Sequence, residues 1–252
     1  MFRYRRATLA TAIALAAIAP TARAQGKFPP DSLVNLKFFP ATMPVRDLIN
    51  QMRFFTSALG VRCQYCHVGV EGMPLDSFNF RSDDKRTKLT ARVMLEMVRA
   101  INTQNLSQIP QRPVPNVEVT CTTCHRGAAR PEELSQLMIE TVTQSGADSA
   151  VRLYRGLRER YYGRAAYDFG EQSLNSAGGA LTAQRRFDDA MRILQLNAEF
   201  FPGSAQVFGQ MGEAQLAKGD TAAAIASYRQ ALVRDSQAPQ ALRRLRQLGQ
   251  TP

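Results

Sequence analysis

Cysteine and histidine are scarce in this sequence: its 252 residues contain four cysteines and two histidines. All six lie in two short stretches, "VRCQYCHVG" at 61–69 and "VTCTTCHRG" at 119–127. No other thiolate or imidazole ligand is therefore available in the chain. Long apolar runs are lacking as well. The run from about Ala7 to Ala19 is shorter than the roughly 20 residues that a membrane-spanning helix needs.

The six residues form the pattern Cys-x-x-Cys-His twice, which is the signature of covalent haem attachment. Each thiol would form a thioether with a haem vinyl group, and the adjacent histidine would bind the iron. The sequence therefore predicts two haem c groups. Their attachment residues would be Cys63, Cys66, Cys121 and Cys124, and their proximal iron ligands His67 and His125.

Three other uses of these motifs are weaker alternatives. Two Cys-x-x-Cys pairs have zinc-ligand spacing, but here they lie 55 residues apart and a histidine follows each pair. A thioredoxin-like redox pair would occur once, near a βαβ pattern that this chain does not show. Two disulfides would suit an exported chain, but they would not require histidine twice.

The first 24 residues have the pattern of a secretory signal peptide. Arginines at positions 3, 5 and 6 precede the apolar run, and Ala22-Arg23-Ala24 forms a small-x-small cleavage site. We expect cleavage after Ala24 and a periplasmic mature chain, where c-type haem is attached. The Arg5-Arg6 pair leaves twin-arginine export as an alternative to the general secretory route.

The chain is basic, with a net charge of +11, of which four arginines in the first 24 residues carry a part, leaving +7. A basic protein attracts acidic partner surfaces and anionic membranes. Nucleic acid is not an expected partner of an exported chain. The arginines at 152, 155, 158, 160 and 164 are typical of a solvated helix face.

Each iron held by one histidine needs a sixth ligand or stays open, and both histidines are already used. Methionine is the next candidate. Before the first motif, Val45, Leu48, Met52, Phe55 and Leu59 recur at helical spacing, between Pro44 at the first turn and Gly60 as a stop. This pattern predicts an amphipathic helix with Met52 in its apolar stripe. Alternatively, Met52 only fills the core.

A second amphipathic helix is expected before the second motif. Its stripe contains Leu89, Val93, Met97 and Ile101, with Met94 beside it, and Ser82, Asp83 or Asp84 would cap its start. The stretch "LSQIPQRPVPNVEVT" that follows is expected to be a loop. Periodicity does not choose between Met94 and Met97.

The blocks "TARVMLEMVRAIN" and "VTCTTCHRG", with a methionine-bearing helix ahead of each motif, resemble the multihaem cytochrome c subunit of photosynthetic reaction centres. That family takes its sixth ligand from a methionine on the preceding helix and feeds electrons to the photo-oxidised pigment pair. The resemblance, over roughly residues 40–130, implies Met52 as one distal ligand and Met94 as the other, with Met97 second. Unlike the four-haem subunit, this chain has two motifs, and we expect it to lack the usual lipid anchor or membrane span.

The resemblance implies an exported dihaem c-type cytochrome that carries electrons to a reaction centre or a related membrane complex, with a soluble cytochrome or other small redox protein as donor. It would be an electron carrier and not an enzyme. The alternatives are a respiratory carrier, a haem peroxidase with one displaceable distal ligand, and a structural or sensory repeat protein.

The second half has a different composition, rich in Ala, Gln and Arg. Helices are expected near 131–142 and 148–162, and a 34-residue shift then aligns Gly178 with Gly212 and Ala190 with Ala224. This period resembles tetratricopeptide repeats, with 240–248 as a capping helix; plain helical hairpins are the alternative. Its expected role is docking a partner or packing on the haem domain. The sequence predicts an all-α chain divided into a signal peptide (1–24), a dihaem domain (25–130), a helical connector (131–170) and repeats (171–250).

Overall fold

The computed structural model describes residues 27–112 and 114–251, and this part of the chain is all-α, as predicted. It contains no β-strand, only one isolated bridge between Val68 and Asn79. The predicted signal peptide and its cleavage site at Ala24 lie outside the described residues. None of the described helices is long and apolar enough to cross a bilayer.

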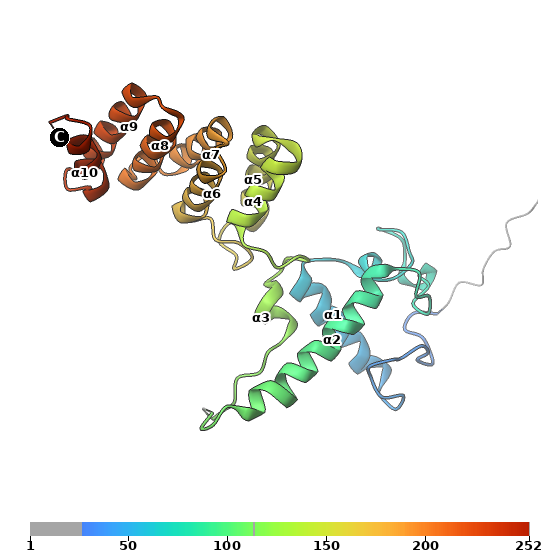
Figure 1. Cartoon of the computed structure of the whole chain (residues 1–252). Coiled ribbons are helices and arrows are strands. Elements are labelled where there is room, and N and C mark those ends of the chain that lie inside the picture. The colour runs from blue at the N-terminus through green and yellow to red at the C-terminus, as the bar shows by residue number, and fades with distance from the viewer. Residues whose placement is uncertain (1–26, 113, 252) are drawn as a thin grey trace, which may run out of the picture.

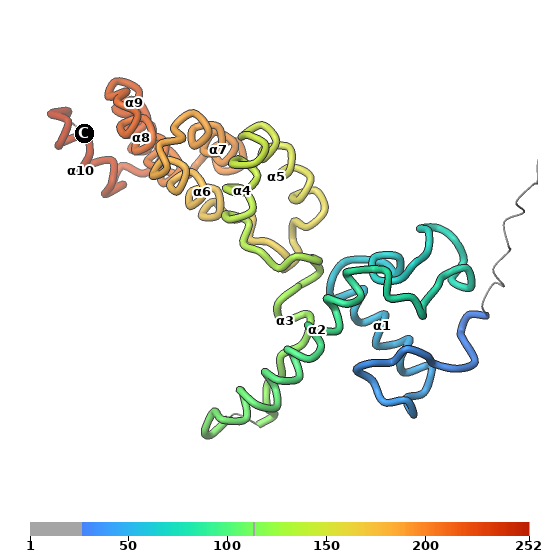
Figure 2. Tube along the Cα trace, turned by 45° about the vertical axis from the view of Figure 1, so that its right-hand side comes forward, coloured from blue at the N-terminus to red at the C-terminus, as the bar shows by residue number. Residues whose placement is uncertain are grey.

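The helices form two lobes (Figures 1 and 2). The first lobe contains α1 (Val45–Leu59), α2 (Arg86–Ala100) and the short α3 (Cys121–His125). The second is a row of helices, made of α4 (Leu134–Ser145), α5 (Ala147–Tyr161), α6 (Glu171–Ala183), α7 (Phe187–Phe200), α8 (Ala205–Lys218), α9 (Thr221–Arg234) and α10 (Pro239–Gln247). Helix α3, which carries the second motif, lies where the lobes meet.

The helices of the second lobe recur at a 34-residue interval. Helices α6, α8 and α10 begin at residues 171, 205 and 239, and α7 and α9 at 187 and 221. The small positions recur too: a Cβ on Gly178 would lie 2.6 Å from the Leu194 side chain, and one on Gly212 would lie 2.5 Å from Tyr228. Each glycine thus lets two helices approach closely, one repeat apart. The tetratricopeptide assignment stays an interpretation, which these spacings support.

Helices α4 and α5 pack as part of the same row. Leu134, Met138 and Val142 of α4 and Tyr154 of α5 belong to one apolar cluster with Leu174 and other buried residues of α6 and α7. The two helices agree with those expected near 131–142 and 148–162, and both contribute to the core of the second lobe. The segment 131–170 was expected to be a helical connector. Its helices α4 and α5 instead pack as the first helix pair of the second lobe.

The first lobe has almost no protein core. Between residues 27 and 130, leaving out residue 113, the buried apolar side chains are Ala58 and Ala128. Large apolar side chains stay exposed instead: on α2, Leu89 is 44% and Val93 64% exposed. The apolar stripe of α2 is therefore largely exposed and that of α1 is half-buried, in contrast to the buried apolar side chains of the second lobe.

The bounds of α1 agree with the sequence, but the start of α2 does not. Helix α1 runs from Pro44 at the N-cap to Gly60, whose φ of 65° ends it in the left-handed region. Helix α2 begins after Lys85, without a side-chain cap. The expectation that Ser82, Asp83 or Asp84 caps α2 is wrong, because Asp83 binds Arg92 and Lys88 instead.

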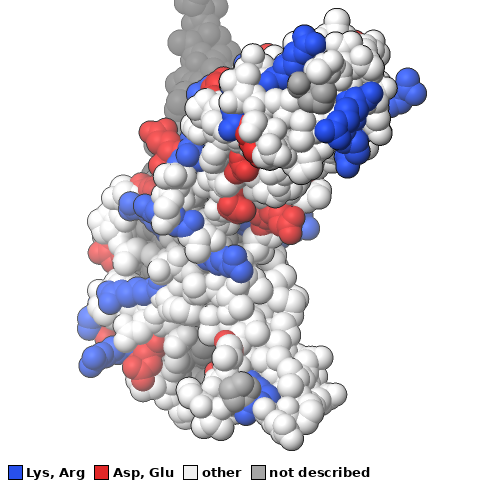
Figure 3. Space-filling model, turned by 90° about the vertical axis from the view of Figure 1, so that its left-hand side faces the viewer, with Lys and Arg blue, Asp and Glu red and all other residues white. Residues whose placement is uncertain are grey.

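The predicted loop after α2 also begins later than expected. Helix α2 continues as a π-helical turn, Ile101–Asn105, and a 3₁₀ turn, Leu106–Gln108. After Gln108 and up to the start of α3, the described residues, which leave out residue 113, contain no helix. Figure 3 shows the face at the C-terminal end of the molecule, where acidic and basic side chains are interspersed and do not form one large patch of a single sign.

Candidate haem-attachment site

The first motif forms a single helical turn directly after α1. Cys63–Tyr65 is a 3₁₀ turn, in which the Cys66 and His67 N–H groups donate to the Cys63 carbonyl at 3.2 and 2.9 Å. The turn places both cysteines and the histidine within one short, folded segment. Burial raises the pKa of the Cys66 thiol, so it is protonated at neutral pH.

The second motif forms the short helix α3, which begins at a capping box and ends at two residues with positive φ. The Thr120 N–H donates to Thr123 Oγ1 at 3.0 Å, one half of a capping box. Arg126 then adopts φ of 51° and Gly127 φ of 91°, which stops the helix just after His125. Burial raises the pKa of the Cys121 thiol, and Cys124 is exposed. Both motifs thus present their cysteines on one helical turn, as thioether attachment requires.

Helix α2 is tied to both motifs, one at each end. Near its start, the Thr87 hydroxyl donates to the Tyr65 carbonyl inside the first motif. Past its end, the Asn102 side chain makes two bonds of 2.8 Å with Val119, accepting from its N–H and donating to its carbonyl. Asn102 lies in the π-helical turn, a feature often found at functional sites. The helix therefore fixes the position of each motif against its apolar stripe.

A second connection joins the two motifs to each other and to the second lobe. The Gly127 N–H donates to the Ala58 carbonyl at 2.8 Å, and a Cβ on Gly60 would lie 2.0 Å from the Gly127 carbonyl oxygen. From α5, the Arg160 guanidinium donates to the Gly60 carbonyl at 3.2 Å. Glycine is required at position 60 by both this approach and its positive φ. The end of α1, the second motif and α5 therefore meet at one point.

The two motif histidines have different surroundings. His125 Nδ1 lies 3.0 Å from the Ala128 carbonyl oxygen. His67 Nδ1 is buried and has no hydrogen-bond partner among the described residues. The edge of the Phe80 ring faces the His67 ring at 4.9 Å between centroids. Burial, and then the nearby Lys88 and Arg92, lower the pKa of His67 to about 4, so its ring is neutral and able to bind a metal.

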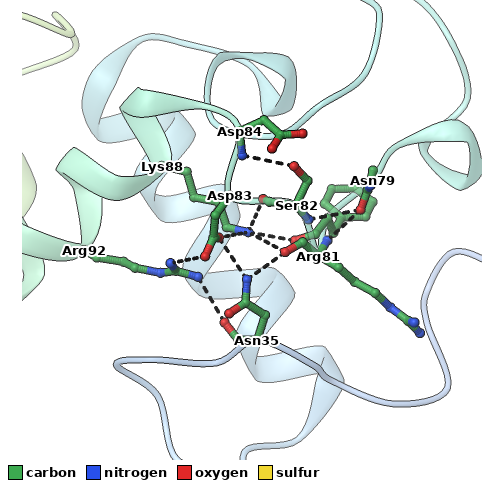
Figure 4. A network of polar contacts seen from close by, with 9 residues as sticks. Asn35, Asn79, Arg81, Ser82, Asp83, Asp84, Lys88 and Arg92 are labelled. Carbon is green, nitrogen blue, oxygen red and sulfur yellow. Dashed lines mark hydrogen bonds and ion pairs between the residues drawn. The ribbon is translucent and has the colours of Figure 1, made fainter.

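A polar network holds the loop that carries Phe80 (Figure 4). Lys88 Nζ donates to the Phe80 and Ser82 carbonyls at 2.9 and 2.7 Å and pairs with Asp83 at 3.1 Å. Arg92 donates to Asp83 at 2.9 Å and to the Asn35 carbonyl at 3.1 Å. The network therefore joins α2 to two loops and places two cations and one carboxylate beside the first motif.

The candidate distal methionines lie on the helices expected to carry them. Met52 is half-buried on α1, and Met94 and Met97 are 38% and 45% exposed on α2. Both α2 methionines extend the uncovered apolar surface formed by Leu89 and Val93. Exposure does not separate Met94 from Met97, so the choice between them stays a prediction.

The described residues fit haem better than the alternatives. All four cysteines are free. Among the described residues, no group of three or more His, Cys, Asp or Glu side chains is placed to hold a metal ion, so the two cysteine pairs do not form one zinc site. A haem is a large apolar body, and it would cover the exposed stripe of α2 and the half-buried stripe of α1. The unpartnered His67 ring and the exposed methionines lie in this same lobe.

Sequence patterns had pointed to the six motif residues and the methionines but not to the residues that hold them in place. Asn102 and Lys88 lie outside any motif, and their partners are mostly backbone atoms of neighbouring loops. The only local signal was their place on the predicted second helix. A pattern of side-chain types does not record bonds to backbone atoms, so these residues became visible only in the fold.

Two Cys-x-x-Cys-His turns beside amphipathic helices are typical of the class of c-type cytochromes. Comparisons with known proteins agree. Residues 46–155 match the family model of the photosynthetic reaction centre cytochrome c subunit. This segment of the chain is therefore similar to that family. The match extends past residue 130 into α5, farther than the motifs alone indicated.

Three curated relatives are similar to the same part of the chain. Cytochrome c-554 of Chloroflexus aurantiacus is 33% identical over 99 residues, covering 36% of this chain and 22% of that protein. The photosynthetic reaction center cytochrome c subunit of Thermochromatium tepidum is 39% identical over 70 residues, covering 28% and 14%. Its counterpart in Rubrivivax gelatinosus is 36% identical over 72 residues, covering 29% and 16%. The chain thus spans less than a quarter of the length of each relative.

Proposed function

We propose that this protein is an exported dihaem c-type cytochrome that carries electrons. Cys63, Cys66, Cys121 and Cys124 hold two haems, His67 and His125 are the proximal ligands, and Met52 and Met94 are the distal ones, with Met97 as the second choice for Met94. The main support is the contrast between the lobes. The second lobe buries its apolar side chains, whereas the lobe with both motifs leaves large ones exposed beside those motifs.

The chain's own residues would bind, orient and shield the two groups. Haem supplies a one-electron redox couple when bound, and methionine–histidine ligation raises its potential. The apolar stripes of α1 and α2 exclude water from the haem faces. Thr87 and Asn102 fix the motifs against α2, and the contact between Gly60 and the Gly127 carbonyl sets the separation of the motifs.

The proposed acceptor is a photosynthetic reaction centre or a related membrane electron-transfer complex. The names of two relatives, photosynthetic reaction center cytochrome c subunit, support this acceptor. A respiratory complex is the alternative, since the chain spans only a small part of those relatives. The donor would be a soluble cytochrome or another small redox protein, and α6–α10 would dock a partner. Cleavage after Ala24 would release the mature chain into the periplasm.

The mass of the purified mature chain tests the haem count. It should exceed the polypeptide mass by two haems, and the reduced pyridine complex should report the same stoichiometry. Replacing Cys63 and Cys66 with Ala should remove one haem, and replacing Cys121 and Cys124 should remove the other. A wild-type chain that carries one haem, or zinc in place of haem, would contradict the proposal.

The electron-carrier proposal is tested separately from the haem count. A carrier with both irons six-coordinate should bind no carbon monoxide in the reduced state at neutral pH, and it should exchange electrons rapidly with a small redox protein. A large Soret change with carbon monoxide would instead indicate an open iron and favour the peroxidase alternative. Absence of any rapid electron exchange would favour a structural or sensory role.

A further inference from the structure

The two proximal histidines differ in the hydrogen bond at Nδ1, the ring nitrogen that does not bind iron. His125 Nδ1 has an acceptor, the carbonyl of the buried residue Ala128, at 3.0 Å. The Ala128 N–H in turn donates to the His125 carbonyl at 2.8 Å, so the acceptor is fixed by a tight backbone turn. His67 Nδ1 is buried and has no acceptor among the described residues. The two motifs, alike in sequence, therefore give their imidazoles different electronic environments.

Aromatic side chains occupy the space beside the His67 ring. The edge of Phe80 faces that ring at 4.9 Å, and Phe78 stacks on Phe80 at 5.7 Å. The Lys88 ammonium donates to the Phe80 carbonyl at 2.9 Å and so fixes the backbone of Phe80. This packing keeps water and other acceptors away from Nδ1, so the missing hydrogen bond is a consequence of the fold.

The hydrogen bond at Nδ1 changes how strongly a histidine donates to iron. A carbonyl acceptor draws the Nδ1 proton away from the ring and raises the basicity of the ligating nitrogen. A more basic ligand stabilises ferric iron more than ferrous iron and lowers the reduction potential. His125 has such an acceptor and His67 does not, so this difference alone favours a higher potential at the first motif.

The charges around the first motif act in the same direction. Lys88 and Arg92 are both partly buried, with side chains 12% and 21% exposed, and they share one carboxylate, Asp83. The network therefore carries a net positive charge beside His67, where burial weakens solvent screening. A positive charge disfavours ferric iron, which carries one more positive charge than ferrous iron. Near the second motif, Arg126 is exposed at the end of α3 and is more strongly screened.

We propose that the two haems are held at different potentials, the haem bound by His67 being the higher, and that Lys88 and Arg92 are positioning residues that set this difference. The inference rests on the proposed function, since it requires a haem at each motif. It gives transfer within the chain a direction, because an electron entering at the His125 haem would move to the His67 haem, toward the higher reduction potential.

A mediated redox titration of the full-length holoprotein tests the proposal, after intact mass has confirmed two haems in every variant. Wild type should titrate in two resolved waves. Lys88→Gln keeps hydrogen-bond donors for the Phe80 loop but removes the charge, and it should shift the higher wave to lower potential while the lower wave stays. Lys88→Arg keeps the charge and should leave both waves in place. Arg92→Gln should shift the same wave in the same direction.

Arg86→Gln is the matched control, because it removes the same charge from an exposed position on the same helix. It should move neither wave appreciably. A single wave in a wild-type protein that carries two haems would overturn the inference, as would a Lys88→Gln shift confined to the lower wave or no larger than that of Arg86→Gln. A mass showing one haem would instead overturn the proposed function, so the two failures are distinguishable.

Discussion

At the residue scale, three methionines compete for two distal positions. Met52 is the methionine of α1, and α2 carries Met94 and Met97, both exposed. Oxidised haem with methionine–histidine ligation has a weak charge-transfer band at the red end of the visible spectrum. We predict that Met52→Ala removes one haem's share of this band and lowers one potential, because losing the soft thioether, which favours ferrous iron, leaves ferric iron relatively more stable. Met94→Ala should remove the rest, and Met97→Ala little.

The paired α2 variants are each other's control. If Met97→Ala removes the second share and Met94→Ala does not, the ligand moves by one turn and the proposed function stands. If neither variant changes the band, the second haem lacks a methionine ligand from α2, and carbon monoxide binding becomes the measurement that decides between a carrier and a peroxidase.

Asp83 gives the first lobe a characteristic response to acid. Hydrogen bonds from Arg92, then Asn35 and Lys88, hold the pKa of this carboxyl well below its usual range. A lowered pKa stabilises the fold above the unfolded-state value of about 3.9, and that stabilisation is lost as the pH falls further toward the folded-state value. We predict that Asp83→Asn lowers the melting temperature of the holoprotein at neutral pH and flattens the decline of stability below about pH 4.

Melting temperatures measured between neutral and strongly acidic pH check this prediction. Asp76→Asn is a suitable control, because Asp76 is exposed in the same lobe. A profile of Asp83→Asn parallel to that of wild type throughout would contradict a special role for the network.

At the element scale, the helix pairs of the second lobe depend on two glycines one repeat apart. A Cβ at position 178 would meet the Leu194 side chain, and one at position 212 would meet Tyr228. Gly178→Ala and Gly212→Ala should each lower the free energy of unfolding of this lobe by about 1–3 kcal/mol, the usual cost of overpacking. Gly156→Ala is the control: it is also in a helix but has open space around its Cβ, so it should stabilise by about 0.5–1 kcal/mol.

Denaturation followed at a haem-independent helical signal checks the glycine series, with the visible spectrum expected to stay unchanged. If Gly178→Ala and Gly212→Ala behave like Gly156→Ala, the close approach of the helices is not needed for stability. Unequal effects at positions 178 and 212 would be consistent with the different partners, a leucine and a tyrosine.

The elements also show what the sequence is able to predict. Helix α1 was predictable to within about one residue, because its stripe is regular and Pro44 and Gly60 lie at its ends. The start of α2 was not, because three capping residues precede it and the network uses Asp83 for another purpose. The π-helical turn at Ile101–Asn105 was likewise not predicted, and its residue Asn102 bonds to Val119, outside the helix. Local sequence patterns therefore predicted a helix end correctly where no residue from another segment bound the capping side chain.

At the scale of the whole molecule, the two lobes should differ in their need for haem. Among the described residues, the buried apolar side chains lie between Leu134 and Leu245, apart from Ala58 and Ala128. The second lobe can therefore be stabilised by its own core. In the first lobe, ordering each residue costs about 1–2 kcal/mol, and two buried alanines cannot offset that cost. Covering its apolar stripes with haem would supply the missing burial, so haem binding and folding of this lobe should be coupled.

We therefore predict that a full-length variant with all four cysteines replaced by Ala keeps α4–α10 and loses the protected structure of α1 and α2. Hydrogen exchange should show fast-exchanging amides across 45–59 and 86–100, while the amides of α6 and α7 stay as protected as in the holoprotein. The full-length chain is needed for this test. Truncation at Gly146 would divide α4 from α5, although both helices share one apolar core with α6 and α7. Equal protection of α1 in the variant and in the holoprotein would mean that the first lobe folds without haem, and that its exposed apolar stripes need another explanation.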